Sequence, residues 1–319
     1  MVLARRLLVP LMLALLLVPL RAGTQELPTI HVAGPPIDDY KPVYYGIQSG
    51  LFKKYGLTVE ATNTQSGSAA LAAVVGGSMQ VAFTSLPAVL QAHLRGVGFK
   101  VVAPAQWYLS DAPTAMLIVK KDGSVHAARD LNGKTIATSS LRDLNQTASL
   151  AWVDANGGDS KTIKMIELPS SAIAAAIDDG RVDAATIADP FLSAAVNSGK
   201  ARVLAHSYDA IGKRFETSVY VSMDDYVQSH QDAMQRFARA MHDSIVYTNT
   251  HLPETVNLVA SYSGVEPAVV AKTIRAIDPE YIDPRNLQPM IDIGVKYGLI
   301  DHAFDANDLI ASTALRGPR

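Results

Sequence analysis

Two stretches of this chain, residues 66–87 and 169–190, follow the same plan at an offset of 103 residues. They read SGSAALAAVVGGSMQVAFTSLP and PSSAIAAAIDDGRVDAATIADP, and they align without a gap. Each predicts a small-residue loop, an alanine-rich helix, a glycine stop, a short apolar strand and a proline that opens another helix. This repeated unit favours two similar α/β lobes. The alternative is a single α/β sheet that uses the unit twice.

The length of the chain agrees with a two-lobed arrangement. A sequence of 319 residues with 48% hydrophobic and 18% charged residues can form two ordered domains. Strand signals alternate with helical signals from Thr29 to about Leu204, which predicts mainly parallel sheets flanked by helices. From Asp224 onward the pattern is nearly all helical.

Two short predicted strands, near 112–120 and 215–222, connect the lobes and form the expected hinge. The first lobe is therefore expected to contain residues 24–112 and 216–319. The second lobe is expected to contain residues 113–215. The remaining residues, 1–23, form a separate N-terminal segment.

This N-terminal segment predicts an export signal. Two arginines precede an uncharged run of about fourteen residues, from 7 to 20, which is too short to cross a bilayer comfortably. Cleavage is expected near residues 22–24, and an uncleaved anchor is the alternative. The chain contains no cysteine, which excludes disulfides, a thiol nucleophile and thiolate metal sites. Together these features predict a soluble protein of the bacterial periplasm.

Polar side chains follow the predicted strands at the end where an open parallel sheet forms its ligand crevice. Helices that begin there present unpaired N–H groups, which attract anionic or carbonyl oxygens. The same residue types also cap helices, and both roles are compatible. The candidate ligand-binding residues are Asp39, Tyr40, Tyr44, Thr64, Gln65, Ser66, Ser68, Thr84, Ser85, Ser139, Ser140, Arg142, Asp143 and Asp189.

Three kinds of contact are expected from these candidates. Arg142 would pair with a carboxylate or sulfonate, unless it lies on an exposed helix surface. Asp189 would bind a donor group or orient Arg142, and the alternative is that it caps the helix that Pro190 opens. Tyr40 and Tyr44 would stack on a ligand or pack in the core.

Catalytic motifs are not found in the sequence. It has no G-x-S-x-G elbow, Walker loop, H-E-x-x-H motif or G-x-G-x-x-G after a strand, and its eight histidines form no pair at i, i+2 or i, i+4. A triad assembled from distant residues is the remaining alternative. We therefore predict a protein that is not an enzyme, with no catalytic residue, metal or organic cofactor. The net charge of −2 and the lack of a basic run argue against nucleic acid as a partner.

Four segments resemble the nitrate/sulfonate/taurine and thiamine-pyrimidine type solute-binding proteins of ABC importers. They are PVYYGIQSGLFKKYGLTVE (42–60), SGSAALAAVVGGSMQVAFTSLPAVL (66–90), RDLNGKTIATSS (129–140) and AAIDDGRVDAATIADPF (175–191). The similarity runs in order from about residue 29 to 260. It implies an α/β, two-lobed type II periplasmic-binding-protein fold with a two-strand hinge. The position of Asp189 is commonly a glutamate before proline in that family, and the expected histidine of the thiamine-pyrimidine branch is replaced by Asp38-Asp39.

The resemblance also implies a function. The chain would be the extracytoplasmic binding component of an ABC importer, with a small organic solute, anionic or aromatic, held between the lobes. Its partners would be this solute and the membrane permease and ATPase, and the protein itself is expected to be a monomer. The alternatives are an enzyme on the same fold, such as the dehydratases of the menaquinone pathway, and a ligand-sensing module for a membrane receptor.

Overall fold

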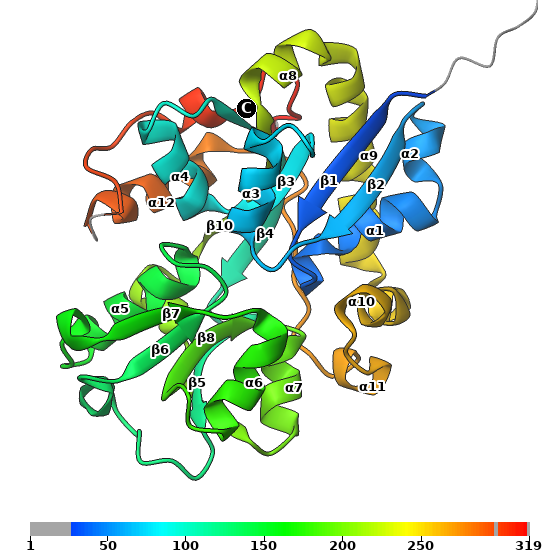
Figure 1. Ribbon diagram of the computed structural model, residues 1–319. Helices are drawn as coiled ribbons and strands as arrows, with labels where there is room; N and C mark the ends of the chain where they lie inside the picture. The colour runs from blue at the N-terminus through cyan, green and yellow to red at the C-terminus, as the bar shows by residue number, and fades with distance from the viewer. Residues whose placement is uncertain (1–26, 297–298, 318–319) are drawn as a thin grey trace, which may run out of the picture.

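The structure is a computed structural model that describes residues 27–296 and 299–317. The predicted export signal, residues 1–23, lies outside the described residues. Within the described part of the chain, none of the helices is both long enough and apolar enough to cross a membrane. Figure 1 shows two lobes, one above the other, each built on its own sheet.

The sheet of the first lobe has five strands in the order β2-β1-β3-β10-β4. Strand β1 lies parallel to β2 and β3, whereas β10 is antiparallel to both β3 and β4. The strands are β1 (Thr29–Gly34), β2 (Thr58–Asn63), β3 (Val81–Ser85), β4 (Phe99–Leu109) and β10 (Arg214–Met223).

The sheet of the second lobe repeats this arrangement in the order β7-β6-β8-β5-β9. Strand β6 is parallel to β7 and β8, and β5 is antiparallel to β8 and β9. The strands are β5 (Ala115–Lys120), β6 (Thr135–Thr138), β7 (Lys164–Glu167), β8 (Ala184–Ala188) and β9 (Ala201–Ala205).

Both sheets are mixed, and the expectation of mainly parallel sheets is confirmed, since four of the five described strands of each sheet run in one direction and only β10 and β5 run against them. The antiparallel members, β10 and β5, are the strands that continue the two chain crossings between lobes. Parallel neighbours need a long crossover, usually a helix, on the face of the sheet. A strand that arrives directly from the other lobe has no such crossover and joins the sheet in the opposite direction.

The internal repeat occupies equivalent positions in the two lobes. Helices α3 (Gly67–Val75) and α6 (Ser170–Asp178) correspond at the offset of 103 residues, and so do the central strands β3 and β8. The helices that follow these strands are α4 (Leu86–Leu94) and α7 (Phe191–Asn197). The expectation of two similar α/β lobes is therefore confirmed.

The first predicted helix is interrupted. The apolar face of Tyr44, Ile47, Leu51 and Tyr55 predicts one continuous helix, but the structure has α1 (Lys41–Gln48) and α2 (Leu51–Lys54). They are separated by Gly50, whose φ of 73° lies in the left-handed region. Glycine reaches this region without the steric cost that other residues incur there, so the chain turns at Gly50.

The C-terminal region is helical, as the sequence predicts, although one helix is shorter. The segment 267–276 forms a helix only as far as Val270, and a turn at 271–273 follows it. The helices are α8 (Asp224–Ser229), α9 (Gln231–Thr250), α10 (Val256–Ser263), α11 (Pro267–Val270) and α12 (Pro284–Lys296). Helix α5 (Leu144–Ala155) covers the second sheet.

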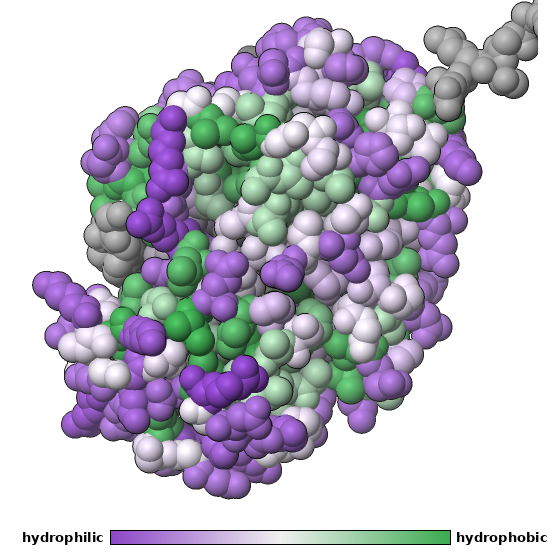
Figure 2. Space-filling view, in the orientation of Figure 1, coloured by the Kyte–Doolittle hydropathy of each residue, from purple (hydrophilic) through white to green (hydrophobic). Residues whose placement is uncertain are grey.

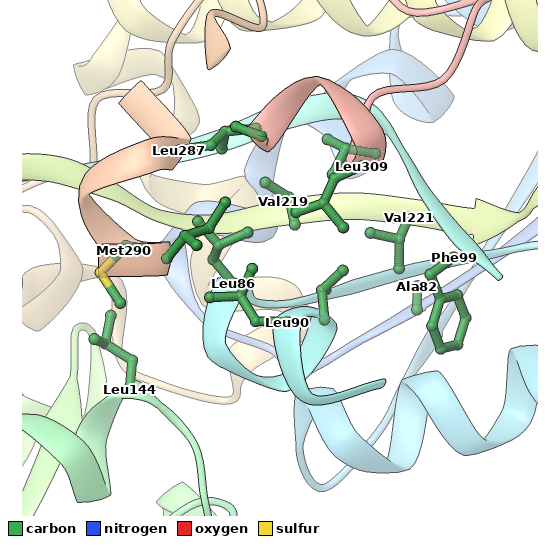
Figure 3. Packing of buried hydrophobic residues seen from close by; sticks show 14 of the residues in the cluster. Ala82, Leu86, Leu90, Phe99, Leu144, Val219, Val221, Leu287, Met290 and Leu309 are labelled. Atoms are coloured by element: carbon green, nitrogen blue, oxygen red, sulfur yellow. The ribbon is translucent and has the colours of Figure 1, made fainter. Parts of the chain in front are cut away.

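Two apolar clusters enclose the first sheet. One, formed with α1 and α9, includes Phe52, Phe83 and Phe237. The other lies on the opposite face and includes side chains of α3, α4 and α12. Figure 3 shows that this second cluster reaches the other lobe, where Leu144 points toward Met290. Apolar packing therefore continues across the boundary between the lobes.

Candidate functional site

A cavity of about 60 Å³ lies between the lobes, at the carboxyl ends of β1, β3, β6 and β8. Its walls come from both sheets and from the two strands that cross between them. The lining residues are Pro35, Ile37, Asp39, Gly67, Ser68, Phe83, Thr84, Ser85, Gln106, Ala115, Ser139, Ser140, Asp143, Leu144, Asn145, Ala188, Tyr208, Thr217 and Ser218.

Direct contacts between the lobes hold this cavity shut. The Ser68 and Ser140 hydroxyls hydrogen bond across its mouth. Beside them, the Gln91 side-chain amide donates to the Arg142 carbonyl at 2.7 Å. In the space-filling view of Figure 2, hydrophilic side chains cover the outer ends of both lobes, and paler and hydrophobic ones lie across the middle. The structure therefore shows the closed form of a two-lobed protein.

The wall of the first lobe is formed where α3 begins against β3. Ser66 caps α3, and its hydroxyl accepts a hydrogen bond from the Ala69 N–H at 3.2 Å. Gly67 then passes so close to Thr84 that a Cβ atom there would lie 2.6 Å from the Thr84 hydroxyl oxygen. This oxygen is buried and has no hydrogen-bond partner among the described residues. A buried hydroxyl without a partner costs free energy, which a ligand in the cavity can recover.

Asp39 is the acidic residue of the first-lobe wall. It lies in the short 3₁₀ turn Asp38–Tyr40, is 2% exposed and lines the cavity. Burial raises the pKa of its carboxyl well above the ordinary value, and Asp278 raises it further, whereas Lys41 lowers it. Its own backbone N–H is the hydrogen-bond donor that stabilises its charged form.

The wall of the second lobe is a connected set of polar side chains at the start of α5. Asp143 caps this helix, and its carboxylate accepts the Gln146 N–H at 2.9 Å and the Thr138 hydroxyl at 3.1 Å. Burial raises the Asp143 pKa to about 6, although these hydrogen bonds oppose the shift. The Tyr208 hydroxyl donates to the Asn145 side-chain oxygen at 2.6 Å. The side chains of the set are thus linked to one another by hydrogen bonds.

Five polar lining residues were not among the sequence-based candidates. Gln106 and Thr217 belong to β4 and β10, and the Thr217 hydroxyl donates to the Gln106 side-chain oxygen at 3.0 Å. The sequence predicts a hinge strand only for the segment of Thr217 (215–222), and it gives no reason to place either side chain in the cavity. The five residues are Gln106, Asn145, Tyr208, Thr217 and Ser218.

Seven of the fourteen candidates line the cavity, and seven do not. Those that line it are Asp39, Ser68, Thr84, Ser85, Ser139, Ser140 and Asp143. Tyr40 instead lies in the core, where its hydroxyl donates to the Val32 carbonyl at 2.8 Å. Tyr44 stacks on Tyr262 with ring centroids 4.3 Å apart. The others outside the lining are Thr64, Gln65, Ser66, Arg142 and Asp189.

Thr64, Gln65 and Ser66 belong to the loop after β2 and do not line the cavity. The Thr64 hydroxyl donates to the Ser66 carbonyl at 2.9 Å, and Ser66 is occupied as a helix cap. Gln65 is exposed. The loop therefore shapes the start of α3, and Ser68 is its side chain that reaches the cavity.

Arg142 lies at the outer edge of the cleft. It is exposed, has a left-handed φ of 60°, and donates its backbone N–H to the Gln146 side chain at 2.7 Å. Its side chain lines outer grooves together with Arg95. The expected pairing of Arg142 with a ligand anion inside the cavity is not part of this closed arrangement.

Asp189 lies behind the cavity at the junction of the lobes. Its carboxylate accepts the Ser193 N–H at 2.9 Å, so it stabilises the first turn of α7, and its backbone carbonyl accepts the Asp38 N–H at 3.2 Å. Burial raises the pKa of this carboxyl to about 6. These contacts correspond to the capping alternative, and a role of Asp189 in binding stays a prediction.

The chemistry of the cavity follows from this lining. Hydroxyls and side-chain amides dominate, two carboxyl groups are present, and the described lining residues include no lysine, arginine or histidine. Within the described residues, no group of three or more acidic or histidine side chains is placed to hold a metal ion. The arrangement can enclose a small polar molecule and hydrogen bond to it from both lobes at once.

Two α/β lobes joined by two crossing strands, with a polar cavity between them, define the class of two-lobed periplasmic-binding folds. Residues 38–255 match the model of the NMT1/THI5-like family, and the chain belongs to this family. A Bacillus subtilis (strain 168) protein described as binding aliphatic sulfonates is 22% identical over 270 residues, which cover 83% of this chain and 80% of that protein.

Two solved structures illustrate the same fold. The alkanesulfonate-binding protein SsuA from Xanthomonas axonopodis pv. citri, bound to MOPS, has a TM-score of 0.74 and 19% identity, and the match covers 92% of this chain and 99% of that one. The periplasmic nitrate-binding protein NrtA from Synechocystis PCC 6803 has a TM-score of 0.76 and 14% identity, with 90% and 87% covered. The predicted fold and family resemblance are thus confirmed.

Proposed function

We propose that this protein is the extracytoplasmic solute-binding component of an ABC importer. The observation that carries the proposal is the closed, polar cavity whose walls come from both lobes. A solute that contacts both walls stabilises the closed form over an open one, which is how a two-lobed binding protein captures its ligand. The sulfonate-binding and nitrate-binding descriptions of similar proteins support the same class of function.

The lobes that close would be 24–112 with 216–319, and 113–215. Segment 1–23 would direct export and be removed near residues 22–24, so that the mature protein works in the periplasm. It would act as a monomer that delivers its solute to a membrane permease and its ATPase. It would not be an enzyme, and it would need no cofactor.

Contacts to the solute would come from the cavity lining. Hydroxyls of both lobes would donate to or accept from the solute, and the N-termini of α3 and α4 would hold an anionic or carbonyl oxygen. From the first lobe these residues are Ser68, Thr84 and Ser85, and from the second they are Ser139 and Ser140.

One observation favours a second candidate, an enzyme on the same fold. Asp39 and Asp143 line the same cavity, and burial raises the pKa of both carboxyls. Paired acids with raised pKa values are a common feature of acid–base catalysis. Asp143, however, is already engaged by several hydrogen bonds as a helix cap, which leaves it poorly suited to exchange protons with a substrate.

A thermal-shift screen of the purified mature protein separates these candidates. The panel contains sulfonates, nitrate, aromatic acids, pyrimidines and amino acids. We expect one compound class to raise the melting temperature and to be recovered unchanged, because binding to the folded state alone stabilises it. Conversion of the stabilising compound would support the enzyme instead. A panel with no stabilising member would contradict the proposed function.

A further inference from the structure

We propose that Asp39 is the specificity residue of the cavity, and that the solute carries a hydrogen-bond-donating nitrogen, an amine or amidine, which pairs with its carboxylate. This inference rests on the proposed function, since it names the class of solute that the closed lobes hold. It is argued from the charges that surround Asp39 and from the lining of the cavity.

A buried group of charged residues lies behind Asp39. The Lys41 ammonium is 3.0 Å from the Asp278 carboxylate and 3.9 Å from the Asp38 carboxylate. The Arg275 guanidinium lies 2.7 Å from Asp38. Three carboxyl groups, those of Asp38, Asp39 and Asp278, therefore share two cations. Each cation lies closer to Asp38 or Asp278 than to Asp39. Among these three, Asp39 is the carboxyl that has no ion pair of its own within the described residues.

Asp39 itself lines the cavity. Lys41 is fully buried, its ammonium also donates to the Ala276 carbonyl at 2.8 Å, and it is not among the residues that line the cavity. Among the described residues, no other side chain donates a hydrogen bond to the Asp39 carboxyl. A buried carboxylate without its full set of donors is costly, and a ligand N–H group can complete that set.

The rest of the cavity agrees with a donor-bearing solute. An anion would enter a space that contains the Asp39 and Asp143 carboxyls and, among the described lining residues, no basic side chain. Such an anion would be buried without an opposite charge to compensate it. A protonated amine or an amidine instead brings N–H donors, which these carboxyl groups can accept. A second, acceptor end of the same solute can face the Thr84 hydroxyl, which is buried without a partner.

The test uses matched pairs of small probes on the mature protein. Taurine is compared with ethanesulfonate, which lacks its amino group, and methylammonium and acetamidinium are compared with nitrate. Affinities are measured by thermal shift and calorimetry. We expect taurine to bind at least tenfold more tightly than ethanesulfonate, and the two cations to stabilise the protein where nitrate does not.

Three variants identify the group responsible. Asp39→Asn, which keeps the side-chain shape, is expected to abolish the preference for the amine. Thr84→Val removes a hydroxyl that has no protein partner, so the variant should fold, bind both sulfonates several-fold more weakly and keep the preference. Asp225→Asn, at an exposed position on α8, should change neither the affinities for the two sulfonates nor the preference for the amine. The melting temperature of each unliganded variant verifies that it is folded.

The outcomes distinguish this inference from the proposed function. Equal binding of taurine and ethanesulfonate, a preference that survives in Asp39→Asn, or no stabilisation by either cation would overturn the role of Asp39. Stabilisation by ethanesulfonate or nitrate without their consumption would still support a solute-binding protein. Consumption of a probe would instead overturn the binding-protein function itself.

Discussion

At the scale of single residues, the contact between Gly67 and Thr84 is the tightest in the cavity wall. A Cβ atom on Gly67 would lie 2.6 Å from the Thr84 hydroxyl oxygen and 3.0 Å from the Thr84 Cα. The backbone of β3 cannot move aside easily, because it is the central strand of its sheet. Glycine is therefore required at this position because a side chain would not fit. Backbone conformation is not the reason, since the φ of Gly67 is not in the left-handed region.

Gly67→Ala should consequently lower the free energy of unfolding by about 1–3 kcal/mol, the usual range for an overpacked interior site. It should also weaken solute binding, because α3 moves away from the cavity. Urea denaturation measures the first effect. Gly98→Ala is the control, since its nearest neighbour would be 3.8 Å away, and a change within about 0.5 kcal/mol is expected. Equal effects of the two substitutions would contradict this account.

Single residues also show how far the sequence predicts the site. Asp39, Ser68 and Ser140 follow strands whose ends meet at the cavity, Thr84 lies near the end of such a strand, and strand position alone places them there. Arg142 is turned outward by its left-handed backbone conformation, which no sequence pattern indicates for an arginine. Whether the lining residues bind a solute stays a prediction.

At the scale of elements, the segment Arg275–Asp278 is held against α1 by buried ion pairs. Lys41 and Asp278 have side chains that are both 0% exposed, and they are 3.0 Å apart. Removing one partner of a buried pair leaves an uncompensated charge, which typically costs about 3–5 kcal/mol. An exposed pair of the same kind contributes about 0–1 kcal/mol.

Lys41→Met is therefore expected to destabilise the protein by about 3–5 kcal/mol near neutral pH. Lys213→Met is the matched control, since Lys213 pairs with Asp209 at 2.7 Å on the surface and should cost less than about 1 kcal/mol. Denaturant unfolding of both variants provides the comparison. A loss below about 1 kcal/mol in Lys41→Met would show that Asp278 is compensated by other groups.

Elements were predictable from the sequence where a local pattern determines them. Strands β3 and β8 and helices α3 and α6 follow from the repeat, because glycine stops and apolar runs act within a few residues. The places of β5 and β10 could not be derived in this way. Their direction in each sheet depends on where the chain enters from the other lobe, which is a long-range property. For the same reason Gln106 and Thr217 were missed as lining residues.

At the scale of the whole molecule, the described structure is closed, and the contacts between the lobes determine how long a solute stays. The Ser68–Ser140 hydrogen bond lies next to the cavity, so a change there would alter the solute contacts as well. The Gln91–Arg142 contact is different. It joins α4 to the segment that precedes α5 in the second lobe, outside the cavity lining, and its donor is a side chain.

Gln91→Ala should remove this contact without touching the solute. A neutral hydrogen bond contributes about 0.5–1.5 kcal/mol, so the affinity is expected to fall by about 2–10-fold. The loss should occur in the dissociation rate, because the contact forms only after the lobes have met. Stopped-flow measurement with the stabilising compound from the thermal-shift screen tests this, with Gln228→Ala, at an exposed position on α8, as the control. An unchanged dissociation rate would mean that apolar packing around Leu144, and not this hydrogen bond, keeps the lobes together.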